Sequence, residues 1–316
     1  MKVVSSAKIR RDIRERLVTN YPELSFSFYT NIEAAEKELL DADILITYGE
    51  DVTSKHIEKC VRLKWIMVIS AGIDQLPFEA IKKRSILVTN VSGIHKIPMA
   101  EYTIAMMLQI AREAKSFIKN EQNKRWERKI KMTELHGKTV GILGAGSIGQ
   151  EIARLSKAFG MKTIGLNRSG REVQNFDDIV TYKGLESLLK QSDFIVGVLP
   201  KTKETDDLLA MNEFKLMKKE AILINIGRGN VIKDEDLIEA LNNGELAHAA
   251  LDVFDEEPLP ENHPYWEMES VTVTPHISGI SPEYQPRAID IFELNLKEFL
   301  LGQENYINKI DLNKGY

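Results

Sequence analysis

A glycine pattern near the middle of the chain has the spacing of a phosphate-binding turn. The segment "VGILGAGSIGQEIA" covers residues 140–153 and places Gly144, Gly146 and Gly149 directly after an apolar run. In a strand–turn–helix unit, the first glycine permits the turn, the second lets the backbone approach a pyrophosphate, and the third lets helix and strand pack closely. The helix N-terminus then attracts the anion. We therefore predict a dinucleotide-binding loop, which also includes Ala145, Ser147 and Ile148.

The residues after the next apolar run indicate which dinucleotide is bound. Asn167 stands where an acidic residue would bind the ribose 2′-hydroxyl of NAD. Arg168, Ser169 and Arg171 follow it. A carboxylate would repel a 2′-phosphate, whereas a guanidinium and a hydroxyl would bind one. These residues favour NADP as the cofactor; if both arginines are ordinary surface residues, the site would accept NAD.

Three further segments place charged or ionisable side chains at the ends of strand-like runs. Arg228 lies between two glycines in "INIGRGNVI", Asp252 and Glu257 lie in "ALDVFDEEPLP", and His276 lies in "VTPHISG". Ligands of open α/β sheets bind at the carboxyl ends of the strands, so these tips can converge over a nicotinamide. Each residue alone has an ordinary structural explanation, but their joint occurrence indicates a catalytic site.

Two alternations of strands and helices would position these residues. In the first part of the chain, "DILITY", "LKWIMVIS" and "SILVTN" are typical of buried parallel strands, with helical stretches such as residues 32–40 between them. A long amphipathic helix is predicted over residues 98–115. From Gly137 onwards, six strand-like runs alternate with helical patterns, as a complete dinucleotide-binding domain requires. The sequence therefore predicts an α/β protein with doubly wound parallel sheets.

Taken in order, these motifs resemble the D-isomer-specific 2-hydroxyacid dehydrogenase family, which includes phosphoglycerate dehydrogenases, glyoxylate and hydroxypyruvate reductases and D-lactate dehydrogenases. The resemblance covers nearly the whole chain, including "SAGIDQLP" and "NVSGIHKIPMAEYTIAMML". It implies two Rossmann-like domains. Residues 1–95 and 286–316 would form a discontinuous, flavodoxin-like substrate domain, and residues 96–285 an inserted NAD(P)-binding domain. The insertion explains why the glycine loop lies so far from the N-terminus.

The resemblance also implies roles for individual residues. His276 would be the general acid/base that protonates the alkoxide formed when a hydride reaches a ketone, and Glu257 would stabilise its imidazolium and fix its tautomer. Arg228 would bind the substrate carboxylate and the 2-oxo oxygen. Asp252 would accept a hydrogen bond from the nicotinamide carboxamide. Ala71 and Gly72 are also expected to contact the substrate. The further residues expected to contact the cofactor are Leu199, Pro200, Ile226, Gly227, Arg228 and His276.

These roles together predict hydride transfer between NADPH and a small 2-oxo acid, as in glyoxylate or hydroxypyruvate reductases. Two alternatives stay open. An enzyme similar to phosphoglycerate dehydrogenase would need a further cationic pocket, for which Lys96 and Arg287 are the candidates. A dinucleotide-sensing protein similar to the corepressors of this superfamily would keep the same catalytic residues without turnover.

Composition narrows the range of partners and compartments. The net charge of −5 gives no attraction to nucleic acid or to anionic membrane, and the single cysteine, Cys60, allows neither an internal disulfide nor a thiolate metal cluster. The sequence has no membrane-spanning run, and we expect neither a secretory leader nor a C-terminal regulatory domain, so the chain is expected in the cytoplasm. The resemblance implies a homodimer through the dinucleotide-binding domain. The helix from Pro98 and the charged arm around Trp126, a packing or subunit-contact residue, would form the contact.

Overall fold

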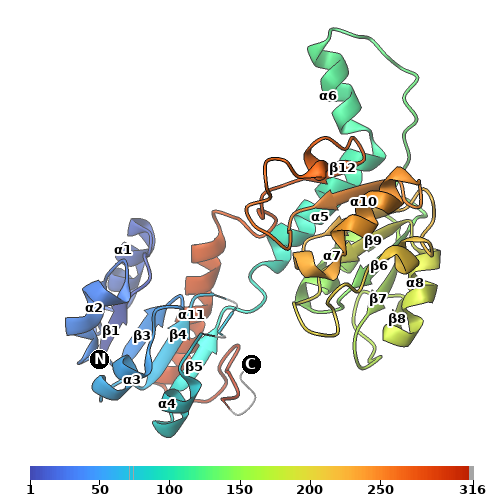
Figure 1. Ribbon diagram of the computed structural model, residues 1–316. Helices are drawn as coiled ribbons and strands as arrows, with labels where there is room; N and C mark the ends of the chain where they lie inside the picture. Colours follow the sequence, from blue (N-terminus) through green and yellow to red (C-terminus); the bar gives the residue numbers. More distant parts are fainter. Residues whose placement is uncertain (71, 74, 313–316) are drawn as a thin grey trace. The chain divides into compact units, whose positions relative to one another are not determined.

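The computed structural model describes residues 1–70, 72–73 and 75–312 of the 316-residue chain. The chain divides into two compact units: unit 1 contains Met1–Ile94 and Ser281–Tyr316, and unit 2 contains His95–Ile280. The domain boundaries expected from the sequence lie after residues 95 and 285. Each unit is a parallel sheet with helices on both faces, so the predicted α/β class is confirmed (Figure 1). In the residues that the structure describes, no helix has the length and apolar character needed to cross a membrane.

Unit 1 contains a five-stranded parallel sheet in the order β2-β1-β3-β4-β5. Its strands are β1 (Lys2–Ser5), β2 (Ser25–Phe28), β3 (Ile44–Thr47), β4 (Trp65–Val68) and β5 (Leu87–Asn90). The prediction of parallel strands is confirmed for β3, β4 and β5. The strands β1 and β2 were not predicted: β1 (KVVS) contains only two apolar residues, and β2 (SFSF) is only partly buried.

The helices of unit 1 cover both faces of this sheet. One face packs against α2 (Ile32–Leu39), α3 (Ser54–Lys59) and α4 (Phe78–Lys83), and the other against α1 (Arg11–Asn20) and α11 (Tyr284–Leu300). Trp65 of β4 stacks on Phe292 of α11 with ring centroids 5.2 Å apart, and both side chains are fully buried. Truncating such an aromatic residue to alanine costs about 3–5 kcal/mol, so the last helix is an integral part of this unit.

Unit 2 contains a seven-stranded parallel sheet in the order β12-β11-β10-β9-β6-β7-β8. Its strands are β6 (Thr139–Leu143), β7 (Lys162–Leu166), β8 (Asp178–Val180), β9 (Phe194–Gly197), β10 (Ile222–Asn225), β11 (His248–Leu251) and β12 (Val271–Val273). The six predicted strands are present, and the missed strand, β8, is a three-residue edge strand. The strand order reverses at β6, which is where ligands bind in doubly wound sheets.

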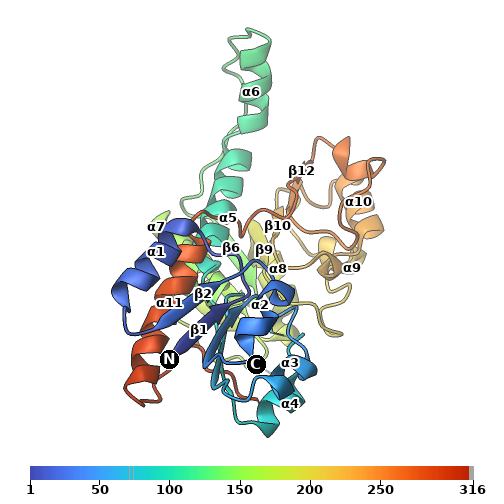
Figure 2. The ribbon, with the colours of Figure 1, turned by 90° about the vertical axis from the view of Figure 1, so that its left-hand side faces the viewer.

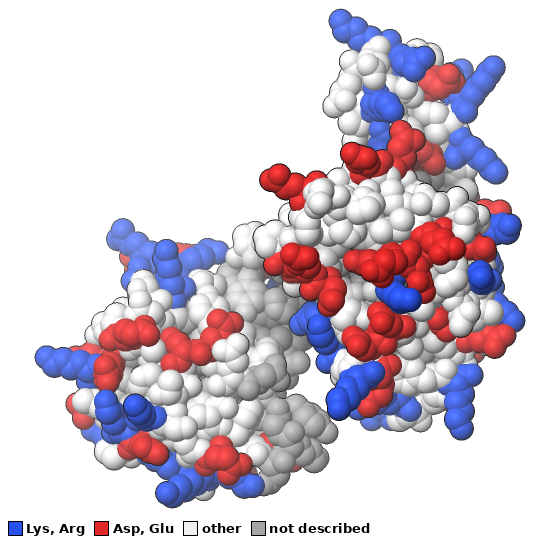
Figure 3. Space-filling view, viewed as in Figure 1, with Lys and Arg blue, Asp and Glu red and all other residues white. Residues whose placement is uncertain are grey.

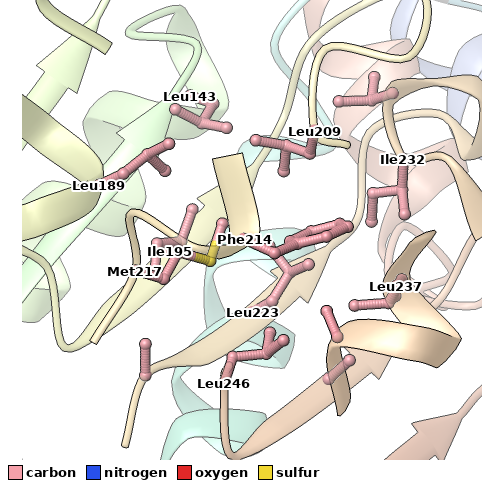
Figure 4. Close-up of a cluster of buried hydrophobic side chains, with 14 of the residues drawn as sticks. Leu143, Leu189, Ile195, Leu209, Phe214, Met217, Leu223, Ile232, Leu237 and Leu246 are labelled. Carbon is pink, nitrogen blue, oxygen red and sulfur yellow. The ribbon is translucent and has the colours of Figure 1, made fainter. Parts of the chain in front are cut away.

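Helices also cover both faces of the sheet of unit 2. On one face lie α5 (Lys96–Ala111) and α7 (Ser147–Ala158). On the other lie α8 (Leu185–Gln191), α9 (Met211–Phe214) and α10 (Asp234–Asn242). Figure 4 shows the core beneath this second group, where Phe214, Leu223 and Leu237 lie close together and are completely buried. The tightly packed core holds the strand ends in place for the loops described below.

A projecting segment of unit 2 departs from the sequence prediction. The helix predicted over residues 98–115 ends at Ala111, because Glu113 adopts a positive φ of 55° and a new helix, α6 (Ala114–Gln122), begins after it. Residues 114–134, called the arm below, extend away from the rest of unit 2 and carry many Lys and Arg side chains (Figures 1, 2 and 3). The side chain of Trp126 is 94% exposed, so the interpretation that it packs within its own chain is wrong.

Candidate active site

The carboxyl ends of neighbouring strands in unit 2 carry the predicted cofactor and catalytic residues. The strands β11, β10, β9 and β6 lie side by side and are parallel, so their carboxyl ends share one edge of the sheet. Gly144 follows β6, Leu199 follows β9, Arg228 follows β10 and Asp252 follows β11. The parallel sheet therefore places these strand ends along one edge.

The glycine loop has two positions that tolerate no side chain and one that faces open space. Gly144 has a φ of +117°, and a Cβ atom there would lie 3.0 Å from the carbonyl oxygen of Val198. A Cβ atom at Gly149 would clash with the carbonyl oxygen of Gly144. At Gly146, which begins α7, a Cβ atom would meet nothing within 4 Å. The loop is thus closely packed underneath and open at Gly146, where a ligand can approach the backbone.

The N-terminus of α7 suits an anion. Gly146 is its N-cap residue and supplies no side-chain acceptor, and the first turn contains no acidic residue. The first N–H groups of a helix have no partner within the helix, and the helix dipole adds a partial positive charge there. Ser147, Ile148 and the two flanking glycines therefore offer backbone donors to a phosphate.

A pocket of about 260 Å³ opens beside the glycine loop. Nine of the residues predicted to bind cofactor line it: Gly144, Ala145, Gly146, Asn167, Arg168, Ser169, Arg171, Leu199 and Pro200. The sequence analysis missed five further lining residues: Leu166, Val173, Tyr182, Thr202 and Thr205. Leu166 directly precedes Asn167, and the two threonines follow Pro200 within five residues, whereas Tyr182 belongs to the short helix η1 (Tyr182–Gly184) after the unpredicted strand β8. Only the tertiary fold brings Tyr182 to this pocket.

Residues 167–171, called the specificity loop below, are held mainly by their own hydrogen bonds. The amide oxygen of Asn167 accepts from the backbone N–H of Gly170 (2.6 Å), and its amide nitrogen donates to the carbonyl oxygen of Arg171 (2.9 Å). These two bonds of the Asn167 amide close the loop on itself, and Arg168, Ser169 and Arg171 stay exposed at the pocket. Asn167 therefore shapes the loop, which presents two guanidinium groups and the Ser169 hydroxyl to the pocket.

Glu204 lies close enough to the specificity loop for the charge of Arg168 to influence its pKa. Hydrogen bonds from its own backbone N–H and from the Thr202 hydroxyl lower the pKa of Glu204, and the Arg168 guanidinium adds to this effect. Burial raises the pKa of the Tyr182 phenol, and Arg168 opposes that rise. Arg168 thus supplies positive potential at this end of the pocket.

Arg228 stands on a stretch of backbone that is packed tightly on both sides. A Cβ atom at Gly227 would lie 2.8 Å from the carbonyl oxygen of Leu199, and one at Gly229 would clash with the backbone of Phe254. The carbonyl oxygen of Arg228 accepts from the amide nitrogen of Asn225 (3.0 Å). Its Nη1 donates to the carbonyl oxygen of Gly227 (2.7 Å), and the residue is exposed. The backbone is fixed while donors of the guanidinium remain for an anionic ligand.

Glu257 and His276 form a direct pair. Glu257 Oε2 lies 2.8 Å from His276 Nδ1, and Glu257 Oε1 accepts from the backbone N–H of Phe254 (3.0 Å). Since an ionised carboxylate can only accept, Nδ1 carries the proton of this bond and Nε2 is left to exchange one. Burial raises the pKa of Glu257, but the hydrogen bonds from His276 and Phe254 and the nearby charge of Arg228 outweigh it, and the net shift is downward. The three predicted catalytic residues are therefore brought together.

The Asp252 carboxylate holds the loop that carries His276. It is completely buried and accepts from the Thr274 hydroxyl (2.6 Å) and from the backbone N–H groups of Ile277 (2.9 Å) and Ser278 (2.8 Å). The carbonyl oxygen of Asp252 accepts from the backbone N–H of His276 (2.9 Å). The expected bond from Asp252 to a nicotinamide carboxamide stays a prediction beside this observed role.

Two of the predicted substrate-binding residues, Ala71 and Gly72, belong to unit 1. Ala71 lies outside the described residues, and Gly72 belongs to unit 1, where its carbonyl oxygen accepts from the Ser70 hydroxyl (2.7 Å). Ile226, also predicted to touch the cofactor, is a buried residue between β10 and Gly227. Among the side chains that the structure describes, no group of three or more His, Cys, Asp or Glu residues could hold a metal ion.

Comparison with known proteins gives one consistent family. Residues 104–278 match the family model of the D-isomer specific 2-hydroxyacid dehydrogenase, NAD binding domain. The chain is 37% identical over 280 residues to a glyoxylate reductase from Aeropyrum pernix, covering 85% of this chain and 84% of the relative. It is also 37% identical over 284 residues to a D-3-phosphoglycerate dehydrogenase from Methanocaldococcus jannaschii, covering 88% of this chain. The chain spans only 54% of that relative's length.

One solved structure matches almost the full length of this chain. A D-isomer specific 2-hydroxyacid dehydrogenase family protein from Aeromonas salmonicida superimposes with a TM-score of 0.83 at 36% sequence identity. The match covers 98% of this chain and 99% of the other. Both units of the chain thus have counterparts in one solved protein.

Proposed function

The chain belongs to the D-isomer-specific 2-hydroxyacid dehydrogenase family, and from this premise we propose that it transfers a hydride between NADPH and a small 2-oxo acid. The observation that carries the proposal is the 2.8 Å pair of Glu257 and His276 beside Arg228, in the same unit as the glycine loop. In the reducing direction, a 2-oxo acid, NADPH and a proton give a 2-hydroxy acid and NADP⁺. The site must therefore bind a dinucleotide, hold an anionic substrate and deliver one proton.

His276 delivers the proton in this proposal. When bound, the nicotinamide cofactor supplies the hydride to the carbonyl carbon, and the oxygen then needs a proton. His276 Nε2 donates it, while Glu257 keeps its bond to the Nδ1 proton throughout. The lowered pKa of Glu257 keeps the carboxylate ionised at neutral pH, so that it accepts the Nδ1 proton of His276.

Arg228 binds the substrate carboxylate and the 2-oxo oxygen. One of its Nη groups is occupied by the Gly227 carbonyl, and a guanidinium has five N–H donors, enough for a bidentate bond as well. The tightly packed glycines on either side keep its backbone in place, so orientation costs little when the substrate binds. Ala71 and Gly72 complete the proposed substrate contacts.

The glycine cradle fits a dinucleotide, and the specificity loop fits NADP. Gly146 has open space above it and the α7 N-terminus lacks acidic residues, so a pyrophosphate is accommodated without a clash. Leu199 and Pro200 would border the adenosine, and Ile226 and Gly227 the nicotinamide side. The pocket contains Arg168, Ser169 and Arg171 and no acidic lining residue among those described, which favours a 2′-phosphate over a free 2′-hydroxyl.

We also propose that two copies associate through the arm. Phe117, Ile118, Trp126 and Met132 expose 38%, 54%, 94% and 40% of their surface, and no residue of α6 is buried. Apolar side chains on a projecting segment are typical of a surface covered in the assembled protein. Light scattering coupled to size exclusion should give the mass of a dimer, and Trp126→Ala should weaken it. A monomeric wild-type protein would contradict this assembly.

The function is tested by turnover with matched cofactors. Purified protein is mixed with glyoxylate or hydroxypyruvate and either NADPH or NADH, and the loss of reduced nicotinamide absorbance is followed. A higher kcat/KM with NADPH supports both the reaction and the cofactor preference. Turnover with NADH alone keeps the reaction and contradicts the preference. Tight cofactor binding without turnover of any 2-oxo acid would favour a dinucleotide sensor.

A phosphorylated hydroxy acid is the second candidate substrate. The 37% identity to a D-3-phosphoglycerate dehydrogenase favours it, although the chain spans about half of that protein. Oxidation of 3-phosphoglycerate with NAD⁺ or NADP⁺ is the assay. Activity that Lys96→Ala or Arg287→Ala abolishes, with glyoxylate reduction unaffected, would favour this candidate.

A further inference from the structure

The Asp252 carboxylate is the most deeply buried acidic group near the catalytic residues. It is completely buried, and among the described residues no Lys, Arg or His side chain forms an ion pair with it. Its two oxygens accept three hydrogen bonds, all from the segment that carries His276: the Thr274 hydroxyl and the N–H groups of Ile277 and Ser278. A buried carboxylate needs such donors because each lost partner leaves charge uncompensated. The donors lie on both sides of His276 in the sequence.

His276 itself has an unusual backbone conformation. Its φ is +53°, in the left-handed region that residues with a Cβ atom rarely adopt. Its N–H donates to the carbonyl oxygens of Asp252 (2.9 Å) and Thr274 (3.1 Å). A strained residue keeps such a conformation only where its surroundings hold it there. The bonds from this segment to Asp252 restrain it, together with the bond from His276 N–H to the Thr274 carbonyl.

A third residue extends this arrangement to helix α5. The hydroxyl oxygen of Tyr102 lies 2.7 Å from Thr274 Oγ1, which in turn lies 2.6 Å from Asp252 Oδ1. A threonine hydroxyl has one proton, and the carboxylate can only accept, so Thr274 donates to Asp252 and Tyr102 must donate to Thr274. Burial raises the pKa of Tyr102 to about 12, so this donor stays protonated at neutral pH.

We infer that Tyr102 is a positioning residue for proton transfer by His276, acting through the directed chain Tyr102–Thr274–Asp252. The Tyr102 donor fixes the rotation of the Thr274 hydroxyl, and that hydroxyl fixes the carboxylate that holds both flanks of His276. Among the hydrogen bonds of the described residues, the Tyr102 hydroxyl bonds to Thr274 and to none of the three proposed catalytic residues. The inference rests on the proposed function, because it assigns the proton to His276.

The test uses substitutions that remove or keep single hydroxyl groups in the full chain. Tyr102→Phe and Thr274→Val each remove one hydroxyl at nearly constant volume, and Thr274→Ser keeps the hydroxyl of Thr274. Tyr265→Phe is the matched control, because the Tyr265 hydroxyl is also buried and donates to Asp234 (2.9 Å) outside this chain of bonds. The assay is glyoxylate reduction by NADPH in H₂O and in D₂O, with KM and cofactor Kd measured alongside.

The expected result is a loss of kcat with a larger solvent isotope effect. Tyr102→Phe should lower kcat about 3–10-fold and Thr274→Val about 10–100-fold, since misplacing a reacting group by about 1 Å has effects of that order. KM should change less than about twofold because Arg228 is untouched, and cofactor Kd should change less than kcat because the glycine loop is untouched. Thr274→Ser should recover most of kcat, and Tyr265→Phe should leave kcat and the isotope effect unchanged.

The inference is overturned if Tyr102→Phe keeps the wild-type kcat and isotope effect, or if Tyr265→Phe lowers kcat and enlarges the isotope effect to the same extent as Tyr102→Phe. Proton NMR of the His276 ring provides a readout without turnover. Its signals should shift or broaden in Tyr102→Phe and stay unchanged in Tyr265→Phe. If the wild-type protein reduces no 2-oxo acid, the proposed function fails, while the NMR comparison still decides whether Tyr102 positions His276.

Discussion

Two regions of unit 2 hold their functional side chains by different means. The catalytic corner, meaning Arg228, Glu257 and His276, stands on backbone that close packing and buried hydrogen bonds restrain. The specificity loop, residues 167–171, is exposed and closed mainly by the amide of Asn167. Proton transfer needs a fixed donor within hydrogen-bond reach, whereas an exposed guanidinium can adjust its side chain to reach a phosphate. The two regions should therefore respond differently to substitution.

Replacing the proposed acid should have the largest effect. His276→Gln removes the exchangeable proton at Nε2 while keeping a polar side chain, so kcat/KM for glyoxylate should fall about 10²–10⁴-fold. Cofactor Kd should change little, because the glycine loop is untouched. Steady-state kinetics with fluorescence titration of NADPH measures both. A variant that retains more than a tenth of wild-type activity would show that the corner does not supply the proton.

Two glycine substitutions, one beside Arg228 and one in the glycine loop, should affect stability very differently. A Cβ atom at Gly229 would clash with the backbone of Phe254, so Gly229→Ala should cost about 3 kcal/mol or more of unfolding free energy. A Cβ atom at Gly146 meets nothing within 4 Å, so Gly146→Ala should change stability by about 0.5 kcal/mol or less.

For cofactor binding, the order of the two effects should be the reverse, and Gly146→Ala should have the larger effect. Gly146→Ala should raise the NADPH Kd roughly tenfold, because the added methyl group occupies the approach to the pyrophosphate. Urea unfolding and cofactor titration on both variants give the two quantities. If Gly146→Ala binds NADPH as tightly as wild type, the glycine loop does not cradle the phosphates.

Removing a guanidinium from the specificity loop should change selectivity without changing chemistry. Arg168→Ala should raise KM for NADPH about 10–100-fold, the range for one charge-assisted hydrogen bond, and leave KM for NADH within about twofold. Lys162→Ala is the control, since Lys162 is an exposed cation on the preceding strand and is absent from the pocket lining. Equal losses with both cofactors would mean that Arg168 does not recognise the 2′-phosphate.

The comparison also explains what could be predicted from the sequence. Gly144 and Gly149 were predictable because a turn and a close helix–strand contact each exclude a side chain at a fixed spacing. Tyr182 could not be found, since β8, which precedes it, is too short to show a strand period. The restraint on His276 could not be found either. It depends on Tyr102, which is remote in sequence and meets Thr274 only through packing of α5.

The smallest expected effect concerns the acid dependence of stability at the catalytic corner. The folded protein lowers the pKa of Glu257 from its ordinary value of 4.5, so the ionised group stabilises the fold above that value. As pH falls through the lower, folded pKa, this contribution is lost. Wild type should therefore unfold at a higher temperature than Glu257→Gln at neutral pH, with the difference shrinking towards about pH 3. This difference in unfolding temperature should be small because 36% of the Glu257 side chain and 52% of the His276 side chain are exposed.

The control repeats the comparison in a His276→Gln background. The pH-dependent part of the temperature difference should largely vanish there, since the main partner of Glu257 is gone. A temperature difference that is constant from neutral to acid pH would mean that the pair does not hold Glu257 ionised. The catalytic corner would then be stabilised by its packing and its other hydrogen bonds and not by this pair.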